Sequence, residues 1–342
     1  MQPTGELHIG NYLGALKNWV ELQDGEDNPL TPFSKGEYEA IFSIVDYHAI
    51  TTPYQPKEMQ KKILDLAMNY LAAGIDPKKS IIFVQSQVPE HTELAWILNT
   101  LTPIADLKRM TQFKEKSEEH PEAVNMGLFD YPVLQAADIL LYKAQAVPVG
   151  EDQKQHIELA RSLARKFNQR FGTVVRGTTS FGQTFSEPKA ILTKGYRIMG
   201  LTDPKKKMSK SYGSANYLGL IDSPEIIQKK LSTAVTDPAR KRKTDKGHPE
   251  KCNLYTLHQL FSNQKQQKEI SHACREAQFG CLDCKKLLAE NISQELAPFR
   301  ERYSQLIKEP EKVREILAEG AERARKIAGE TMREVKGKMG LI

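Results

Sequence analysis

The first eleven residues of the chain place a histidine, an asparagine and two glycines directly ahead of a helical pattern. Apolar residues over Tyr12–Val20 recur on one helix face, so a helix starts next to His8. A helix start presents unpaired N–H groups and the positive end of its dipole, which suit a phosphate. Gly5 and Gly10 allow a nucleotide to approach the backbone. The turn is a candidate phosphate site, although such a turn alone is also common as plain structure.

A second basic element follows far downstream, where Lys207-Met-Ser-Lys-Ser211 places two lysines in a polar loop. Ammonium groups on such a loop can stabilise charge that develops on a phosphate. Phosphoryl transfer depends on positioning and charge stabilisation more than on a protein nucleophile. A site built of glycines, a helix start, His8 and two lysines would fit such chemistry.

A carboxylate stands in an apolar helical segment at 128–142. Tyr131, Gln135, Asp138 and Tyr142 recur at i, i+4, i+7 and i+11 and so share one helix face. Alanine, isoleucine and leucine surround Asp138, and a carboxylate in such surroundings needs a partner. We expect Asp138 to bind a ligand, with a structural pair or cap as the alternative.

All four cysteines lie within 33 residues, with the spacing C-x21-C-x6-C-x2-C. In a reducing compartment such clustering indicates a metal site before a disulfide pair. Zinc is a serious candidate because tetrahedral sites with four cysteine ligands are common. Zinc ribbons usually present two close pairs, however, whereas this chain has one pair and two single cysteines. Four thiolates can also hold an iron–sulfur cluster through such uneven spacing, and four thiols without metal remain the third possibility.

Strands and helices alternate in the first part of the chain. Strand patterns occur at 40–45, 81–85 and 146–149, and helical patterns start near Pro56, near His91 and after Gly150. This rhythm predicts a Rossmann-like, doubly wound parallel sheet of the α/β class. Ligands of such sheets bind at the carboxyl ends of the strands, where His48 and Gly150–Gln153 follow. We expect Arg197–Gly200 to form the last strand.

Beyond Ser211 helical patterns dominate to the C-terminus, starting at the cap Ser223-Pro224. We therefore divide the chain into an α/β domain, 1–214, and an all-helical domain, 215–342. A length of 342 residues allows two such domains. A net charge of +6 is compatible with a polyanionic partner but does not identify one. Arg240–Lys243 is the densest positive cluster, and we expect it to contact RNA.

The sequence has neither an apolar run long enough to span a bilayer nor a signal-peptide pattern at its start. We therefore expect a soluble cytoplasmic protein without a membrane partner.

The turn at His8 and the loop at Lys207 resemble the HIGH and KMSKS signatures of class I aminoacyl-tRNA synthetases. Further blocks at 46–51, 110–116, 131–142, 147–159 and 197–211 resemble bacterial-type tryptophanyl-tRNA synthetases, and the likeness covers nearly the whole chain. The run Val147–His156 is the most specific block, because the related tyrosyl enzymes have a different loop there. The cysteine motif is similar to that of a subset of this family that carries a [4Fe–4S] cluster.

This resemblance implies activation of tryptophan by Mg·ATP, which requires Mg²⁺, and transfer of the tryptophanyl group to the 2′-hydroxyl of the terminal adenosine of tRNA(Trp). It also implies a homodimer that forms through the segment near 80–145. The catalytic groups it implies are His8, Asn11, Lys114, Lys207 and Lys210. The nucleotide contacts it implies come from Gln2, Pro3, Thr4, Gly10, Asn11, Gly150, Glu151, Asp152, Ile198, Lys207, Met208, Ser209, Lys210 and Ser211.

The resemblance also assigns a tryptophan pocket and a set of cluster ligands. Asp138 accepts the indole N–H, and Gln153 and Tyr131 meet the α-amino group. The remaining pocket residues it implies are His48, Gln135, Val147 and Val149. The cluster ligands are Cys252, Cys274, Cys281 and Cys284, with zinc as the alternative metal.

Three departures from the family pattern are visible. Asn11 replaces the last histidine of the HIGH signature, and Gln135 stands where many relatives have methionine. The family also places a short apolar strand, the central one of its sheet, directly before the residues that match Gln2-Pro3. We therefore expect the native protein to start upstream of Met1.

Three other functions compete with this interpretation. A tyrosyl-type synthetase is the nearest enzyme, and a nucleotide-binding RNA regulator could retain the fold without catalysis. An RNA-binding metalloprotein would explain Arg240–Lys243 and the cysteines but not residues 1–211. Tryptophan-dependent exchange of pyrophosphate into ATP separates these possibilities.

Overall fold

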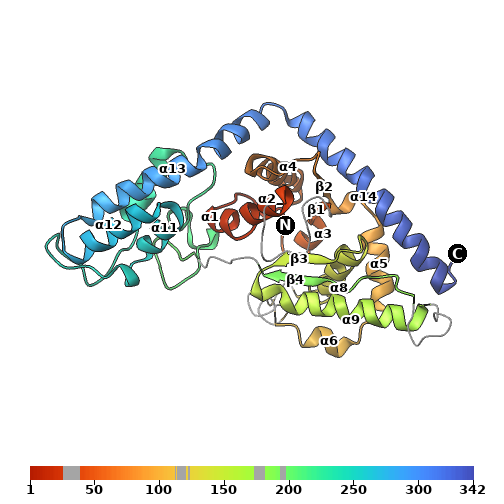
Figure 1. Ribbon diagram of the computed structural model, residues 1–342. Helices are drawn as coiled ribbons and strands as arrows, with labels where there is room; N and C mark the ends of the chain where they lie inside the picture. The colour runs from red at the N-terminus through yellow and green to blue at the C-terminus, as the bar shows by residue number, and fades with distance from the viewer. Residues whose placement is uncertain (26–38, 112, 114–120, 122–123, 173–181, 193–197) are drawn as a thin grey trace.

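The computed structural model describes residues 1–25, 39–111, 113, 121, 124–172, 182–192 and 198–342. Parallel strands interleaved with helices form the first part of the chain, and helices form the second part (Figure 1). This arrangement confirms the predicted fold class. No helix in the described ranges is both long enough and apolar enough to cross a bilayer.

Two pairs of parallel strands carry the α/β part. Strand β1 (Ala40–Ile44) pairs with β2 (Ser80–Val84), and Ala40 is opposite Ser80. Strand β3 (Ala146–Val149) pairs with β4 (Lys189–Leu192). All five residues of β2 are buried, as expected for a strand that is covered on both faces. Strand β4 is short and half exposed, which explains why no sequence pattern predicted it.

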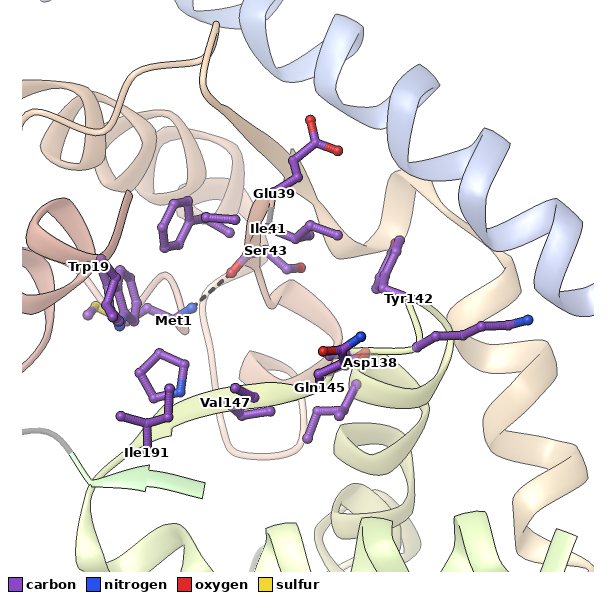
Figure 2. A pocket seen from close by; sticks show the side chains of 18 residues that line it. Met1, Trp19, Glu39, Ile41, Ser43, Asp138, Tyr142, Gln145, Val147 and Ile191 are labelled. Carbon is purple, nitrogen blue, oxygen red and sulfur yellow. Dashed lines mark hydrogen bonds between the residues drawn. The ribbon is translucent and has the colours of Figure 1, made fainter. Parts of the chain in front are cut away.

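The two pairs are not hydrogen-bonded to each other in the described part of the chain. A cavity of about 470 Å³ lies between β1 and β3 (Figure 2). Met1 lies along β1, because its ammonium donates to the Ser43 carbonyl at 2.9 Å and its carbonyl accepts the Val45 N–H at 3.1 Å. The expectation of an additional strand ahead of Gln2 stays a prediction.

The prediction of a last strand at Arg197–Gly200 is wrong for the part that is described. Met199 forms only an isolated antiparallel bridge with Lys207. The Met208 N–H donates to the Ile198 carbonyl, and the Gly200 N–H donates to the Lys206 carbonyl. The segment therefore satisfies its backbone groups against the lysine loop instead of a sheet edge.

Helices cover both strand pairs, and local signals set several of their ends. Helix α4 (Pro56–Ala73) starts with proline and ends at Gly74 (φ +113°), a left-handed conformation that favours glycine. Helix α10 (Pro224–Thr233) starts at the Ser223 cap, as predicted. The other helices before residue 210 are α1 (Ile9–Asn11), a π-helical turn (Tyr12–Leu16), α2 (Lys17–Asp24), α3 (Asp46–Ala49), α5 (Glu90–Asn99), α6 (Ile104–Lys108), α8 (Met126–Leu140) and α9 (Lys154–Phe171).

The C-terminal helices reach back to the α/β part. These are α11 (Asn253–Phe261), α12 (Gln264–Arg275), α13 (Cys281–Leu306) and α14 (Pro310–Met339). Helix α13 packs on α10 and α4, and α14 then runs past β2 and α5 (Figure 1). Gly320 lets α14 approach the sheet, because a Cβ at this position would overlap the Ile82 carbonyl oxygen. One apolar core therefore contains residues from β1, α4 and α13.

Candidate active site

His8 caps the first helix and is fixed by two reciprocal hydrogen bonds. Its Nδ1 accepts the Gly10 N–H at 3.0 Å, and its own N–H donates to Asn11 Oδ1 at 3.1 Å. Asn11 therefore closes a capping box, which satisfies two N–H groups at the helix start. Because Nδ1 accepts a hydrogen bond, neutral His8 carries its proton on Nε2.

The lysine loop meets the N-terminal turn. The Lys210 ammonium donates to the Thr4 carbonyl at 3.1 Å, and Gly5 next to it has a φ of +98°. Burial, Lys210 and Lys207 together lower the pKa of His8 to about 4. The structure thus brings the predicted site residues His8, Thr4, Lys207 and Lys210 into one region.

The remaining loop residues of the predicted nucleotide site are placed by backbone bonds. Met208 is buried, and Ser209 caps a 3₁₀ turn at Lys210–Tyr212 by accepting the Ser211 N–H. Ile198 is also buried, and its carbonyl accepts the Met208 N–H at 2.9 Å. This bond places Ile198 directly behind the lysine loop.

Gly150–Gln153 follows the carboxyl end of β3 as predicted. Glu151–Gln153 forms a 3₁₀ turn that leads into α9. A Cβ on Gly150 would lie 2.7 Å from Asp152 Oδ1, so glycine leaves room for this carboxylate. The Gln153 amide donates to Asp152 at 2.8 Å, and Gln135 donates to Gln153 at 3.4 Å. These contacts join the turn to helix α8.

Asp138 is surrounded by donors from three elements. Its Oδ2 accepts from His48 Nε2 at 2.9 Å, and its Oδ1 accepts from Gln85 Nε2 at 2.7 Å and from His91 Nδ1 at 2.6 Å. Burial raises the pKa of Asp138, but the hydrogen bonds from His48 and His91 outweigh burial and hold the pKa below its ordinary range. The carboxylate is therefore ionised and acts only as an acceptor.

Tyr131 is linked to Asp138 through His48. The Tyr131 hydroxyl lies 3.1 Å from His156 Nε2, and the Tyr131 ring packs edge-on against His48. Gln2 donates to the His48 carbonyl at 3.3 Å, which links the N-terminal turn to this pocket.

The cavity between β1 and β3 is lined by only some of the residues that were predicted to bind tryptophan. Asp138 and Val147 line it, together with Trp19, Tyr142 and Ile191 (Figure 2). Val149 is buried at the end of β3, outside this lining. Lys114 lies outside the described residues, so its predicted position is not described.

Sequence reasoning missed Gln85 and His91, both of which are fully buried. Gln85 follows β2 directly, so the rule that drew attention to His48 after β1 could have found it. His91 opens a helix that packs on α8, and no local pattern identifies its partner. Tyr142 shares the predicted face with Asp138 but lies beyond the end of α8, where its hydroxyl contacts His91 Nε2 at 2.8 Å.

The four cysteines gather around one small cavity next to Arg240. Cys252 precedes α11, Cys274 ends α12, and Cys281 and Cys284 form the first turn of α13. All four are free thiols. Burial and the other three cysteines raise the pKa of Cys284 to about 12. Within the described residues, no group of three or more His, Cys, Asp or Glu side chains is arranged to hold a metal ion.

Donors surround this thiol cluster. Arg240 Nη1 lies 3.6 Å from Cys274 Sγ, while Arg240 Nη2 donates to the Phe279 carbonyl at 2.7 Å. Arg240 Nε is buried without a hydrogen-bond partner among the described atoms. His258 Nε2 lies 3.3 Å from Cys284 Sγ. These positive and N–H groups suit an anionic set of thiolates.

Comparisons with known proteins identify the family of this chain. The family described as tRNA synthetases class I (W and Y) matches residues 1–297. A tryptophan–tRNA ligase of Deinococcus radiodurans is 47% identical over 345 residues, covering 100% of this chain and 97% of the relative. A tryptophan–tRNA ligase of Helicobacter pylori is 44% identical over 344 residues, with 100% and 97% covered.

The solved structures show the same likeness. The tryptophanyl-tRNA synthetase of Campylobacter jejuni, complexed with ADP and tryptophan, superposes with a TM-score of 0.83 at 36% identity, covering 99% of this chain and 98% of that one. A tyrosyl-tRNA synthetase of Archaeoglobus fulgidus shares the fold at 19% identity, a TM-score of 0.64 and coverage of 89% and 88%. The chain therefore belongs to the tryptophan–tRNA ligases, a family of class I tRNA synthetases.

Proposed function

We propose that tryptophan–tRNA ligation proceeds here in two steps at the region where the N-terminal turn meets the lysine loop. The carboxylate of tryptophan attacks the α-phosphorus of Mg·ATP, which gives tryptophanyl-adenylate and pyrophosphate. The 2′-hydroxyl of the terminal adenosine of tRNA(Trp) then takes the tryptophanyl group and releases AMP. The hydrogen bond from Lys210 to Thr4 carries this proposal, because it joins the two basic elements that a leaving pyrophosphate needs.

The phosphates are met by N–H and ammonium groups of the two elements. His8 presents its Nε2–H as a donor, because its Nδ1 is occupied by Gly10. Lys207 and Lys210 supply the positive charge, with Lys114 as a further ammonium. Mg²⁺ enters with the nucleotide as part of the substrate. The backbone around Gln2, Pro3, Thr4, Gly10 and Asn11 lies against the nucleotide.

The nucleoside part occupies the neighbouring loops. Gly150, Glu151 and Asp152 hold the ribose, because carboxylate oxygens can accept hydrogen bonds from its hydroxyl groups. The apolar side chain of Ile198 lies against the adenine. Met208, Ser209 and Ser211 close the lysine loop over the nucleotide.

The tryptophan pocket is built around Asp138, which accepts the indole N–H. An indole N–H is a donor only, so an ionised carboxylate matches it. Tyr131 and Gln153 meet the α-amino group, and His48, Gln135, Val147 and Val149 complete the pocket. The Campylobacter jejuni relative is complexed with ADP and tryptophan, which supports binding of both a nucleotide and tryptophan by this chain.

A [4Fe–4S] cluster is the group proposed for the four thiols, with zinc as the alternative. Zinc ribbons usually present two close pairs of cysteines, whereas this chain has one close pair and two single cysteines. A cluster binds one thiolate at each of its irons, so it spans a wider set of thiols. The buried Nε of Arg240 has no hydrogen-bond partner among the described atoms, and the positive charge of this side chain suits the anionic thiolates that would hold such a group. Its role is to hold the segment 252–284 together.

Two macromolecular partners follow from the surface. Arg240 turns into the thiol cluster, whereas Lys241, Arg242 and Lys243 are exposed beside it, where their positive charge suits the backbone of tRNA(Trp). A second copy of the chain covers the helices of 80–145, because Trp96, Ile104 and Met126 expose 74%, 63% and 74% of their surface there. Such a homodimer acts in the cytoplasm, where ATP and tRNA are available.

Exchange of labelled pyrophosphate into ATP tests the proposal. We expect exchange to depend on tryptophan and to be absent with tyrosine, and purified tRNA(Trp) to accept tryptophan. Exchange that needs no amino acid, or that responds to tyrosine, would contradict the proposed site. Binding of tRNA without either reaction would favour an RNA regulator.

A further inference from the structure

The hydrogen bonds around Asp138 leave little of its acceptor capacity open. A carboxylate offers about four lone-pair positions on two oxygens. Gln85 and His91 occupy Oδ1, and His48 occupies one position on Oδ2. The Asp138 side chain is 14% exposed, and Oδ2 accepts only the hydrogen bond from His48 among the described contacts, so it has a position left for a ligand. The three donors thus fix the direction in which Asp138 can accept one further N–H.

His91 is the most deeply placed of these donors. It is 0% exposed, and its two ring nitrogens have partners on opposite sides. Nδ1 meets Asp138 Oδ1 at 2.6 Å, and Nε2 meets the Tyr142 hydroxyl at 2.8 Å. In a neutral ring that donates from Nδ1, Nε2 accepts, so Tyr142 donates its hydroxyl proton. The order Tyr142, His91, Asp138 then gives every hydrogen bond a donor and an acceptor.

Packing holds this chain in place. The His91 ring lies 5.7 Å from the ring of Phe83 on β2 and 5.4 Å from the ring of Tyr142. The neighbouring strand, the start of α5 and the end of α8 therefore fix the orientation of the imidazole. A buried donor held in this way positions its acceptor, because moving the carboxylate would leave a buried N–H without a partner.

We propose that His91, supported by Tyr142, is a positioning residue that aims Asp138 at the indole N–H and so determines selectivity for tryptophan over analogues that lack this proton. The inference rests on the proposed role of Asp138. It adds two residues that do not touch the substrate but decide how sharply the pocket recognises it. A site built to accept a particular N–H rejects analogues without it, because its own polar group is then left unpaired.

Two substitutions of His91 separate positioning from packing. His91→Gln places its amide where Nε2 stands, so contact with Tyr142 survives and the donor to Asp138 is lost. His91→Asn places its amide where Nδ1 stands, so the donor to Asp138 survives. Tyr142→Phe removes the hydroxyl alone and keeps the ring against Phe83. His272→Gln, at an exposed position on α12, is the matched control.

The experiment measures pyrophosphate exchange in the full-length protein with tryptophan and with the analogue whose ring N–H is replaced by sulfur. For His91→Gln we expect KM for tryptophan to rise about 10–100-fold, as for loss of a hydrogen bond to a charged group, with KM for ATP unchanged. The preference for tryptophan over the analogue should fall by a similar factor. His91→Asn should recover most of both values, and Tyr142→Phe should show a smaller loss.

Equal rises of KM for tryptophan and ATP, or an unchanged preference over the analogue in His91→Gln, would overturn the inference. If His91→Gln fails to fold, the same comparison is made in Tyr142→Phe. An unchanged preference for tryptophan in that variant would show that the hydrogen bond from Tyr142 to His91 does not contribute to selectivity, and it would overturn the inference. Asp138→Asn distinguishes failure of the proposed tryptophan pocket from failure of the positioning role of His91. If it leaves tryptophan use intact, the proposed pocket fails; if it alone destroys tryptophan use, only the role of His91 fails.

Discussion

Lys210 donates a hydrogen bond to the Thr4 carbonyl at 3.1 Å, across a sequence separation of 206 residues. Next to this contact Gly5 adopts a left-handed φ, and a Cβ there would lie 3.8 Å from the Lys210 ammonium. Burial lowers the pKa of Lys210 by more than the nearby Glu6 carboxylate raises it. The ammonium is thus held at the edge of the phosphate site, where an incoming phosphate can replace the carbonyl as its partner.

We therefore predict that Lys210→Ala slows adenylate formation about 10²–10³-fold, as for removal of one group that stabilises transition-state charge. Transfer to tRNA should change far less, because pyrophosphate has left by then. Single-turnover kinetics of each step provide the measurement, with Lys205→Ala, at an exposed position of the same segment, as the control. Equal slowing of both steps would count against this role.

Asp138→Asn is expected to damage tryptophan use while ATP binding stays nearly intact. An asparagine amide would turn a donor toward one of the three donors that now face the carboxylate. We expect kcat/KM for tryptophan to fall at least about 10²-fold, since a buried polar group is left unpaired. Steady-state exchange measures it, and Asp130→Asn on the same helix is the control. An unchanged kcat/KM for tryptophan would refute the assignment.

Protein purified without oxygen should be brown, absorb at about 400 nm and contain about four irons per chain. Cys284→Ser should remove the colour, because serine is a poor ligand for iron in such a cluster. Metal analysis of the same samples separates the alternatives. Colourless protein with one zinc per chain would exclude the cluster and keep the metal site formed by the four cysteines.

The stability of the fold should depend on His8 between its two pKa values. The ordinary value is 6.5, and the folded protein lowers it to about 4. Between these values the unfolded chain binds a proton that the folded chain does not, so stability rises with pH there and is lost as pH falls from 6.5 toward 4. His8→Asn retains a capping side chain and should flatten this dependence. Urea unfolding at several pH values measures it, with His272→Asn as the control; an unaltered slope would contradict the prediction.

Two glycines of helix α14 should respond oppositely to alanine. At Gly320 a Cβ would overlap the backbone oxygen of Ile82, so Gly320→Ala should cost about 1–3 kcal/mol of the free energy of unfolding. At Gly329 a Cβ would meet nothing within 4 Å. Gly329→Ala should therefore stabilise the protein by about 0.4–1 kcal/mol. Denaturant midpoints of the two variants compare them directly, and equal effects would mean that α14 does not approach β2 closely.

Local sequence signals were sufficient to predict several helices and strands and to recognise the family. Proline at 56, Gly74 and the Ser223 cap determined helix ends, and the β-branched runs determined where β1 and β2 lie. Such signals act between residues a few positions apart, through capping and side-chain periodicity, so they are readable from the sequence. The blocks around His8, Val147 and Lys207 identified the family, and the comparisons confirm it.

The tertiary structure decided which residues meet. Nothing in the spacing of Asp138 indicates that His48, Gln85 and His91 will donate to it, because these residues belong to three different elements. The same holds for Met199, whose backbone pairs with the lysine loop and not with a sheet, and for β4, which is too short to show a pattern. Hydrogen bonds between distant segments depend on how whole elements pack, and that packing is fixed by the buried surface of the complete chain.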